Sequence, residues 1–158
     1  IKNLVKDIEG NTLVLFNYIE KHGTPLYELI NNNIDDARKV FFVHGGTEVE
    51  DREEVRKITE TESNAVIVAS YGTFSTGINI KRLHNIIFAS PSKSRIRNLQ
   101  SIGRVLRKGE GKDMAILYDI ADDIGGQNYT LKHLNERVNI YNDENFRYEV
   151  IKVNLRAN

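Results

Sequence analysis

Four polar side chains recur at helical spacing between residues 94 and 109. Arg97, Gln100, Arg104 and Arg107 are three or four positions apart, so that on a helix they form one row. Because a guanidinium group is planar and stays charged at any working pH, an arginine row suits an anionic, oxygen-rich partner, with phosphate as the first candidate. A second row is apolar and would pack into a core: Ile96, Leu99, Ile102, Gly103 and Leu106.

The basic charge of the chain is concentrated around this helix. The 158 residues include 22 basic and 22 acidic side chains, so the net charge is zero. Residues 81–112, however, contain nine basic side chains and one acid, Glu110, which gives this block a charge of +8 and leaves −8 for the remainder. Such a block fits either a focused polyanion site or a solvated basic face. The helical register of the arginines favours the polyanion site.

Composition excludes several other kinds of site. There is no cysteine, so disulfides and thiolate metal sites are ruled out, and the four histidines are scattered without ligand spacing, so that we expect no bound metal. Neither a G-x-x-x-x-G-K-[ST] loop nor a G-x-S-x-G elbow is present. The aspartate pairs at 35–36 and 122–123 are typical of turns. No apolar run is long enough to span a bilayer, and we expect no membrane partner.

The elements that must position the arginine row follow from the hydrophobic pattern. Short, near-continuous apolar runs predict strands buried on both faces, and these alternate with helical segments. This order predicts an α/β fold with a parallel sheet and helices on both faces, in a single domain over residues 1–158. The predicted strands are 12–16, 39–43, 64–70, 85–89, 114–118 and 148–155, and the predicted helices are 1–8, 17–33, 48–61, 94–109 and 129–142.

Three loops of small and polar residues follow predicted strands. They are 44–46, 71–79 and 90–92, and in a parallel sheet the carboxyl ends of the strands meet at one edge. Hydroxyl groups and glycine amides in such loops can hydrogen-bond phosphate oxygens without adding charge. The arginine helix follows directly from the third loop.

The same residues resemble a known family. Gln100-x-x-Gly103-Arg104-x-x-Arg107 resembles motif VI of superfamily 2 helicases and translocases, Ser75–Asn79 resembles their motif V, and Leu13–Asn17 resembles motif IV. The three occur in the family's order and spacing, and the resemblance covers residues 10–120. It implies the fold of a second, C-terminal RecA-like domain.

The resemblance also implies a role for individual residues. Arg107 would be the arginine finger that reaches the γ-phosphate of ATP, and Arg104 would contact the same phosphate region. Gln100, Gly77 and Asn79 would bind the nucleotide, although Asn79 stands where many relatives carry aspartate. The residues expected to face the nucleic-acid backbone are His44, Gly45, Gly46, Ser70, Thr73, Lys93 and Arg97.

In this family the phosphate-binding lysine loop and the acidic magnesium motif belong to the first RecA-like domain, and neither occurs here. We therefore expect ATP and Mg²⁺ to be held mainly by an N-terminal RecA-like domain of the same protein. The chain begins with Ile1 and shows no leader, so we expect a part of a longer protein that has little ATPase activity alone. Residues 1–9 would end an interdomain helix, and residues from about 125 to 158 would form a helix-and-strand extension.

The resemblance is strongest to recombination and repair helicases of T-even bacteriophages. It implies an ATP-dependent DNA helicase that acts on branched DNA and on RNA–DNA hybrids in R-loops, in the cytoplasm of the infected host. Two alternatives stay open. One is a free-standing nucleic-acid-binding α/β module that grips its ligand through the +8 block without ATP, and the other is a purely structural or protein-docking domain.

Overall fold

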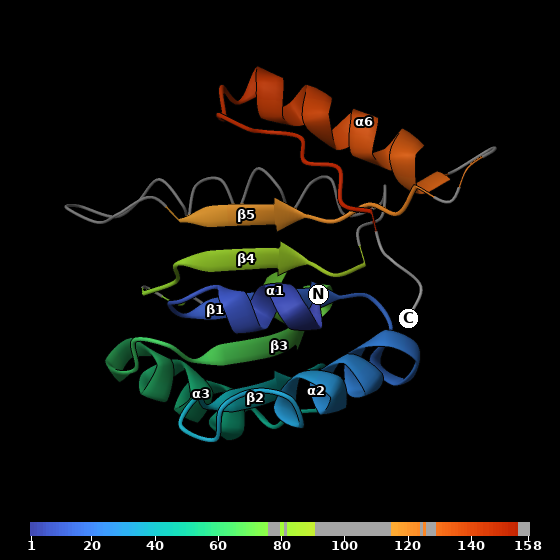
Figure 1. Cartoon of the computed structure of the whole chain (residues 1–158). Helices are drawn as coiled ribbons and strands as arrows, with labels where there is room; N and C mark the ends of the chain where they lie inside the picture. Colours follow the sequence, from blue (N-terminus) through green and yellow to red (C-terminus); the bar gives the residue numbers. More distant parts are fainter. Residues whose placement is uncertain (76–79, 81, 91–114, 124, 126–128, 155–158) are drawn as a thin grey trace.

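The computed structural model describes residues 1–75, 80, 82–90, 115–123, 125 and 129–154. Five strands form one sheet in the order β2-β3-β1-β4-β5, and every neighbouring pair is parallel (Figure 1). The parallel α/β fold predicted from the sequence is therefore confirmed. The strands are β1 (Thr12–Phe16), β2 (Val40–Val43), β3 (Val66–Ser70), β4 (Asn85–Phe88) and β5 (Ile116–Asp119).

Burial of the strands follows their position in the sheet. Every residue of β1, β3 and β4 is buried, as expected for strands with a neighbour on each side and helices on each face. Three of the four residues of β2 are half-buried, and β5 begins with the half-exposed Ile116. These two strands form the edges of the sheet.

Helices cover both faces of the sheet. Side chains alternate along each strand, so that Leu13 and Leu15 face one layer while Val14 and Phe16 face the other. The first layer contains α3 (Val49–Thr61), α4 (Tyr71–Ser75) and α6 (Tyr129–Asp143). The second contains α1 (Lys2–Asp7), the π-helical turn η1 (Ile19–Gly23) and α2 (Thr24–Asn31).

Three sequence predictions differ from the structure. Residues 17–33, predicted as one helix, form η1 followed by α2, with Pro25 in the first turn of α2. Residues 71–75, predicted as loop, form α4. Residues 148–154, predicted as most of a last strand, contain no strand, and Val150, Ile151 and Val153 are each more than 70% exposed. Alternating apolar and polar residues are typical of a strand. A strand also needs a neighbouring backbone to pair with, which the alternation does not provide.

The change from η1 to α2 has a steric cause at Gly23. The amides of His22 and Gly23 both donate to the carbonyl of Tyr18, at 2.9 and 3.0 Å, which widens the turn. Gly23 lies so close to the ring of Phe16 that an ideal Cβ would stand 2.4 Å from Cε2 of that ring. Only glycine therefore fits where this turn packs on β1.

The amino ends of the strands are held by buried polar side chains. The amide of Asn11 donates to the carbonyls of Thr59, Glu62 and Arg82 at 2.8–3.1 Å, and its oxygen accepts from the Ala65 amide at 2.9 Å. One side chain thus joins α3 and its C-terminal end to the segments that lead into β3 and β4.

Arg38 does the same for the start of the chain. Its guanidinium group donates to the carbonyls of Val5, Gly10 and Asn64 and to the hydroxyl of Thr12. Burial lowers the pKa of Arg38, and the carboxylate of Glu9 opposes that shift. Arg38 therefore fixes α1 to the amino edge of the sheet.

We predict that Gly23→Ala destabilises the fold, because the new methyl group overlaps the buried ring of Phe16. Overpacking of this kind costs about 1–3 kcal/mol of unfolding free energy, measurable by denaturant titration. Gly45→Ala is the matched control, since an ideal Cβ there has no neighbour within 4 Å. An equal loss of stability in both variants would contradict the steric explanation.

Candidate functional site

The carboxyl ends of the strands lie at one edge of the sheet. Phe16 is opposite Ser70, Val43 is opposite Ala69, and Phe88 is opposite Asp119. The segments that follow the five strands therefore begin at the same edge, as predicted. We call it the carboxyl edge.

Residues 44–47 form a tight turn directly after β2. The Thr47 amide donates to the His44 carbonyl at 2.9 Å, and the His44 amide donates to the Thr47 hydroxyl at 3.0 Å. The Gly46 amide donates to Nδ1 of His44 at 3.1 Å, which fixes the ring against the turn. Gly45 and Gly46 are exposed. This geometry leaves the Gly45 backbone open to a ligand at the carboxyl edge.

Ser70 and Thr73 form hydrogen bonds with each other. Their hydroxyl oxygens are 2.7 Å apart, and the Thr73 amide approaches the Ser70 hydroxyl at 3.3 Å, so that Ser70 caps the start of α4. Both residues are buried, with 8% and 3% of their surface exposed. The sequence missed α4 because Ser, Thr and Gly are typical of loops as well as of helix caps. The predicted role of the two hydroxyl groups toward nucleic acid stays a prediction.

The other predicted site residues lie outside the described residues. They are Gly77, Asn79, Lys93, Arg97, Gln100, Arg104 and Arg107, together with the rest of the 94–109 helix. In the sequence, the described residues before position 91 end at Ser90. The Asn17 amide donates to the Ser90 hydroxyl at 2.9 Å, and the Asn17 side chain donates to the Ser90 carbonyl at 2.7 Å. The segment that leads to the predicted arginine helix therefore starts beside β1.

Sequence reasoning missed a buried ionic cluster at the end of β5. Nε and Nη2 of Arg137 donate to the two carboxylate oxygens of Asp119 at 2.7 and 2.8 Å, and the Tyr141 hydroxyl donates to the same carboxylate at 2.6 Å. The Asp119 side chain is 10% exposed and that of Arg137 is 3% exposed. The available signal was Asp119 itself, because a carboxylate that ends a buried strand requires a partner.

This cluster fixes α6 to the carboxyl edge. Burial raises the pKa of Tyr141, and the charge and hydrogen bond of Asp119 act in the same direction. The phenol therefore keeps its proton and stays a donor to the Asp119 carboxylate. The guanidinium fork and the phenol together hold Asp119 in one orientation.

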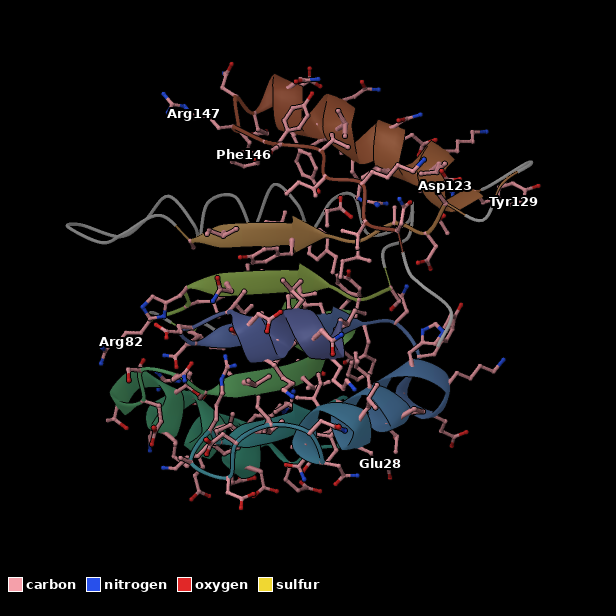
Figure 2. All side chains as sticks on the ribbon, in the orientation of Figure 1. Glu28, Arg82, Asp123, Tyr129, Phe146 and Arg147 are labelled. Atoms are coloured by element: carbon pink, nitrogen blue, oxygen red, sulfur yellow. The ribbon has the colours of Figure 1, made fainter. Side chains whose placement is uncertain are left out.

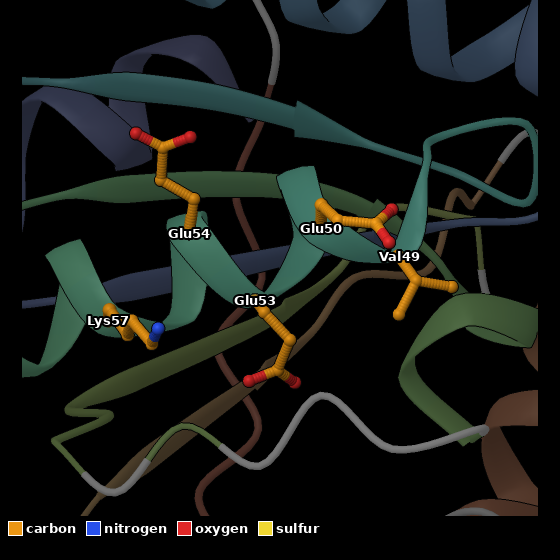
Figure 3. Close-up of a pocket in the computed structure, with 5 residues that line it drawn as sticks. All are labelled: Val49, Glu50, Glu53, Glu54 and Lys57. Atoms are coloured by element: carbon orange, nitrogen blue, oxygen red, sulfur yellow. The ribbon is translucent and has the colours of Figure 1, made fainter.

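A surface hollow on α3 has a different character. It has a volume of about 500 Å³ and is lined by Val49, Glu50, Glu53, Glu54 and Lys57 (Figure 3). Three carboxylates and one ammonium group give it negative charge, which opposes a phosphate ligand. It contains none of the predicted site residues.

Two further findings concern the described residues. Within that part of the chain, no three His, Asp or Glu side chains are grouped as ligands of a metal ion. No helix there has the length and apolar character needed to cross a membrane.

Comparison with known proteins decides the family. Residues 1–109 match the family described as "Helicase conserved C-terminal domain". The chain belongs to this family. The resemblance to the C-terminal domain of superfamily 2 helicases is therefore confirmed, while the roles of the motif residues stay predictions.

Two relatives are informative about this helicase domain. It is 39% identical over 160 aligned residues to a protein of Enterobacteria phage T4 named "ATP-dependent DNA helicase uvsW", and the alignment covers 93% of this chain. The chain spans 31% of that helicase's length. A solved structure, the "C-terminal part of Fun30 ATPase domain", shares the fold with a TM-score of 0.61 at 21% identity, over 85% of this chain and 42% of the other.

We predict that Arg137→Met strongly destabilises this helicase domain, because it leaves the Asp119 carboxylate buried without its ion pair. Breaking such a pair from one side costs about 3–5 kcal/mol of unfolding free energy. Arg56→Met is the control, since Arg56 pairs with Glu53 and Glu60 on the surface of α3 and should cost far less. Similar losses from a thermal or denaturant titration would overturn the assigned role of the cluster.

The raised pKa of Tyr141 predicts an alkaline loss of stability. In the unfolded chain a tyrosine ionises near pH 10, whereas folded Tyr141 keeps its proton. Its contribution is thus complete below about pH 10 and is lost as the pH rises from there through the folded pKa. Unfolding free energies measured between about pH 9 and 11 should fall less steeply in Tyr141→Phe than in the parent. Tyr129→Phe, at a tyrosine that is 70% exposed, should follow the parent.

Proposed function

We propose that this chain is the second motor domain of an ATP-dependent superfamily 2 DNA helicase that acts on branched DNA, including R-loops, in recombination and repair. The observation that carries the proposal is the motif VI row, with Arg104 and Arg107 at helical spacing in a chain that belongs to the helicase C-terminal family. The likeness to a phage helicase whose name states ATP dependence and DNA supports the choice of nucleotide and nucleic acid.

In this proposal the chain contributes charge to a reaction whose nucleotide is bound elsewhere. ATP and Mg²⁺ are held mainly by an N-terminal RecA-like domain of the same protein. Arg107 reaches the γ-phosphate across the cleft between the domains, Arg104 contacts the same phosphate region, and Gln100 lies at the nucleotide with Gly77 and Asn79. An arginine supplied from outside the binding site stabilises the charge that develops on the transferred phosphoryl group, and contributes about 10³–10⁵ to kcat.

The nucleic-acid track runs along the carboxyl edge. Its described part includes the turn at His44, Gly45 and Gly46, where the exposed backbone of Gly45 suits phosphate oxygens. Lys93 and Arg97 supply positive charge. Closure of the two domains on ATP, and reopening after hydrolysis, would shift the grip of these loops on the backbone.

The test of the arginine finger is Arg107→Ala in the protein that carries both motor domains. Turnover should fall about 10³–10⁵-fold while ATP binding and the folded state survive, because the finger acts on the transition state. Steady-state ATPase assays and nucleotide-binding titrations measure the two effects. Arg147→Ala is the control, at an exposed arginine beyond the end of α6 (Figure 2). Unaltered turnover in Arg107→Ala would reject the assignment.

The +8 block favours one alternative, an ATP-independent nucleic-acid-binding module. In that case Lys93→Ala and Arg107→Ala should weaken DNA binding equally in the absence of nucleotide, with a steep dependence on salt. A motor domain should instead lose ATPase activity in Arg107→Ala and DNA affinity in Lys93→Ala.

A further inference from the structure

Two aromatic rings are exposed at the carboxyl edge, immediately after β1. Tyr18 is 62% exposed and His22 is also exposed. Their ring centroids are 5.4 Å apart with the planes inclined at 72°. None of the motifs discussed above uses either residue. The pair therefore lies at the edge that carries the candidate site.

The rings are held in place by the backbone beneath them. The Tyr18 carbonyl accepts from the amides of His22 and Gly23, so that the two side chains project from the same widened turn. Gly23 packs against the buried ring of Phe16. Asn17, the residue before Tyr18, is fixed by both of its hydrogen bonds to Ser90. The pair is therefore presented by a rigid support rather than by a free loop.

Further rings connect this support to the candidate nucleic-acid turn. Phe42 lies 5.7 Å from Phe16, 5.1 Å from Tyr27 and 5.1 Å from His44, measured between ring centroids. Phe16 and His44 thus belong to one aromatic cluster, which begins under η1 and ends in the 44–47 turn. The Tyr18–His22 pair and the turn are supported by the same packing.

We propose that Tyr18 and His22 form a stacking platform for the bases of a single strand of nucleic acid. Every base has a π-face, so a ring platform grips a strand without reading its sequence. The inclined planes allow a base stacked on one ring to meet the edge of the other. This inference rests on the proposed function, to which it adds a contact with bases beside the contacts with phosphates.

The surroundings of the pair favour a base over other ligands. The residues between the rings include Glu20 and Lys21, both exposed, whose charges cancel, so the platform itself does not attract phosphate. A stable protein interface needs roughly 800 Å² from each partner, and these charged neighbours interrupt the apolar surface. A planar aromatic ligand the size of one base matches the two rings.

The test measures the affinity of the full-length protein for two oligonucleotide probes. One is a short oligothymidylate, and the other is the same sugar–phosphate chain with its central bases removed. The parent should bind the complete strand more tightly, and Tyr18→Ala should weaken that binding about 5- to 100-fold while leaving the affinity for the abasic strand unchanged. Tyr18→Phe should retain the parent's preference, because it retains the ring.

The controls separate this inference from the proposed function. Tyr129→Ala removes an equally exposed tyrosine from the start of α6 and should keep the parent's preference for bases (Figure 2). If the parent and Tyr18→Ala each bind the complete strand and the abasic strand with equal affinity, the base platform is wrong. The proposed contacts with the phosphate backbone would not be affected by that result. Failure of the parent to bind either probe would overturn both. His22→Ala should give a smaller loss in the same direction, and an unchanged affinity there would remove His22 from the platform.

Discussion

The arrangement of the whole sheet depends on one buried amide. The side-chain amide of Asn11 forms hydrogen bonds with four backbone groups. The backbone carbonyl of Asn11 also accepts from the backbone amides of His84 and Asn85. Asn11 immediately precedes the central strand β1. Its hydrogen bonds thereby align the starts of β3 and β4 with the start of β1. Asn11 thus contributes to the register in which β3 and β4 pair with β1.

The two edges of the sheet are built differently. At the amino edge, polar side chains saturate the backbone groups that would otherwise be buried without a partner, which favours rigidity. At the carboxyl edge, Gly45 in the 44–47 turn leaves its backbone exposed, and the rings of Tyr18 and His22 are exposed. The cluster at Asp119, by contrast, is buried at this edge and joins α6 to β5.

Much of this fold could be predicted from the sequence, for identifiable reasons. The run Thr12–Phe16 has a helix or strand on every side, so its apolar character is continuous and its bounds were predicted correctly. The turn after β1 was not, because the reason for it is the distance between Gly23 and the ring of Phe16. Likewise Ser70 caps a helix only where the backbone after β3 turns, and Arg137 meets Asp119 only through the packing of α6. Such contacts join residues distant in the sequence and leave no local pattern.

More of the candidate site was predicted from the spacing of the motifs than from the expected packing of the fold. The arginine row was found by residue type and helical spacing, and the resemblance to the helicase motifs then implied which residues would act on ATP. The proposed base platform, in contrast, was not predicted from the sequence. Tyr18 and His22 stand four apart in a segment predicted as an ordinary helix, and no local pattern indicated that both rings would be exposed at the carboxyl edge.

The hydrogen bonds of Arg38 have a mechanical consequence. One guanidinium group binds the carbonyl of Val5 in α1, the carbonyl of Gly10 and the hydroxyl of Thr12 at the start of β1. A pull on α1 would therefore load the central strand through a short, stiff linkage, instead of being absorbed by the turn at Gly10. In the motor proposed above, such a joint would transmit displacement of α1 to the whole sheet and so to the carboxyl edge.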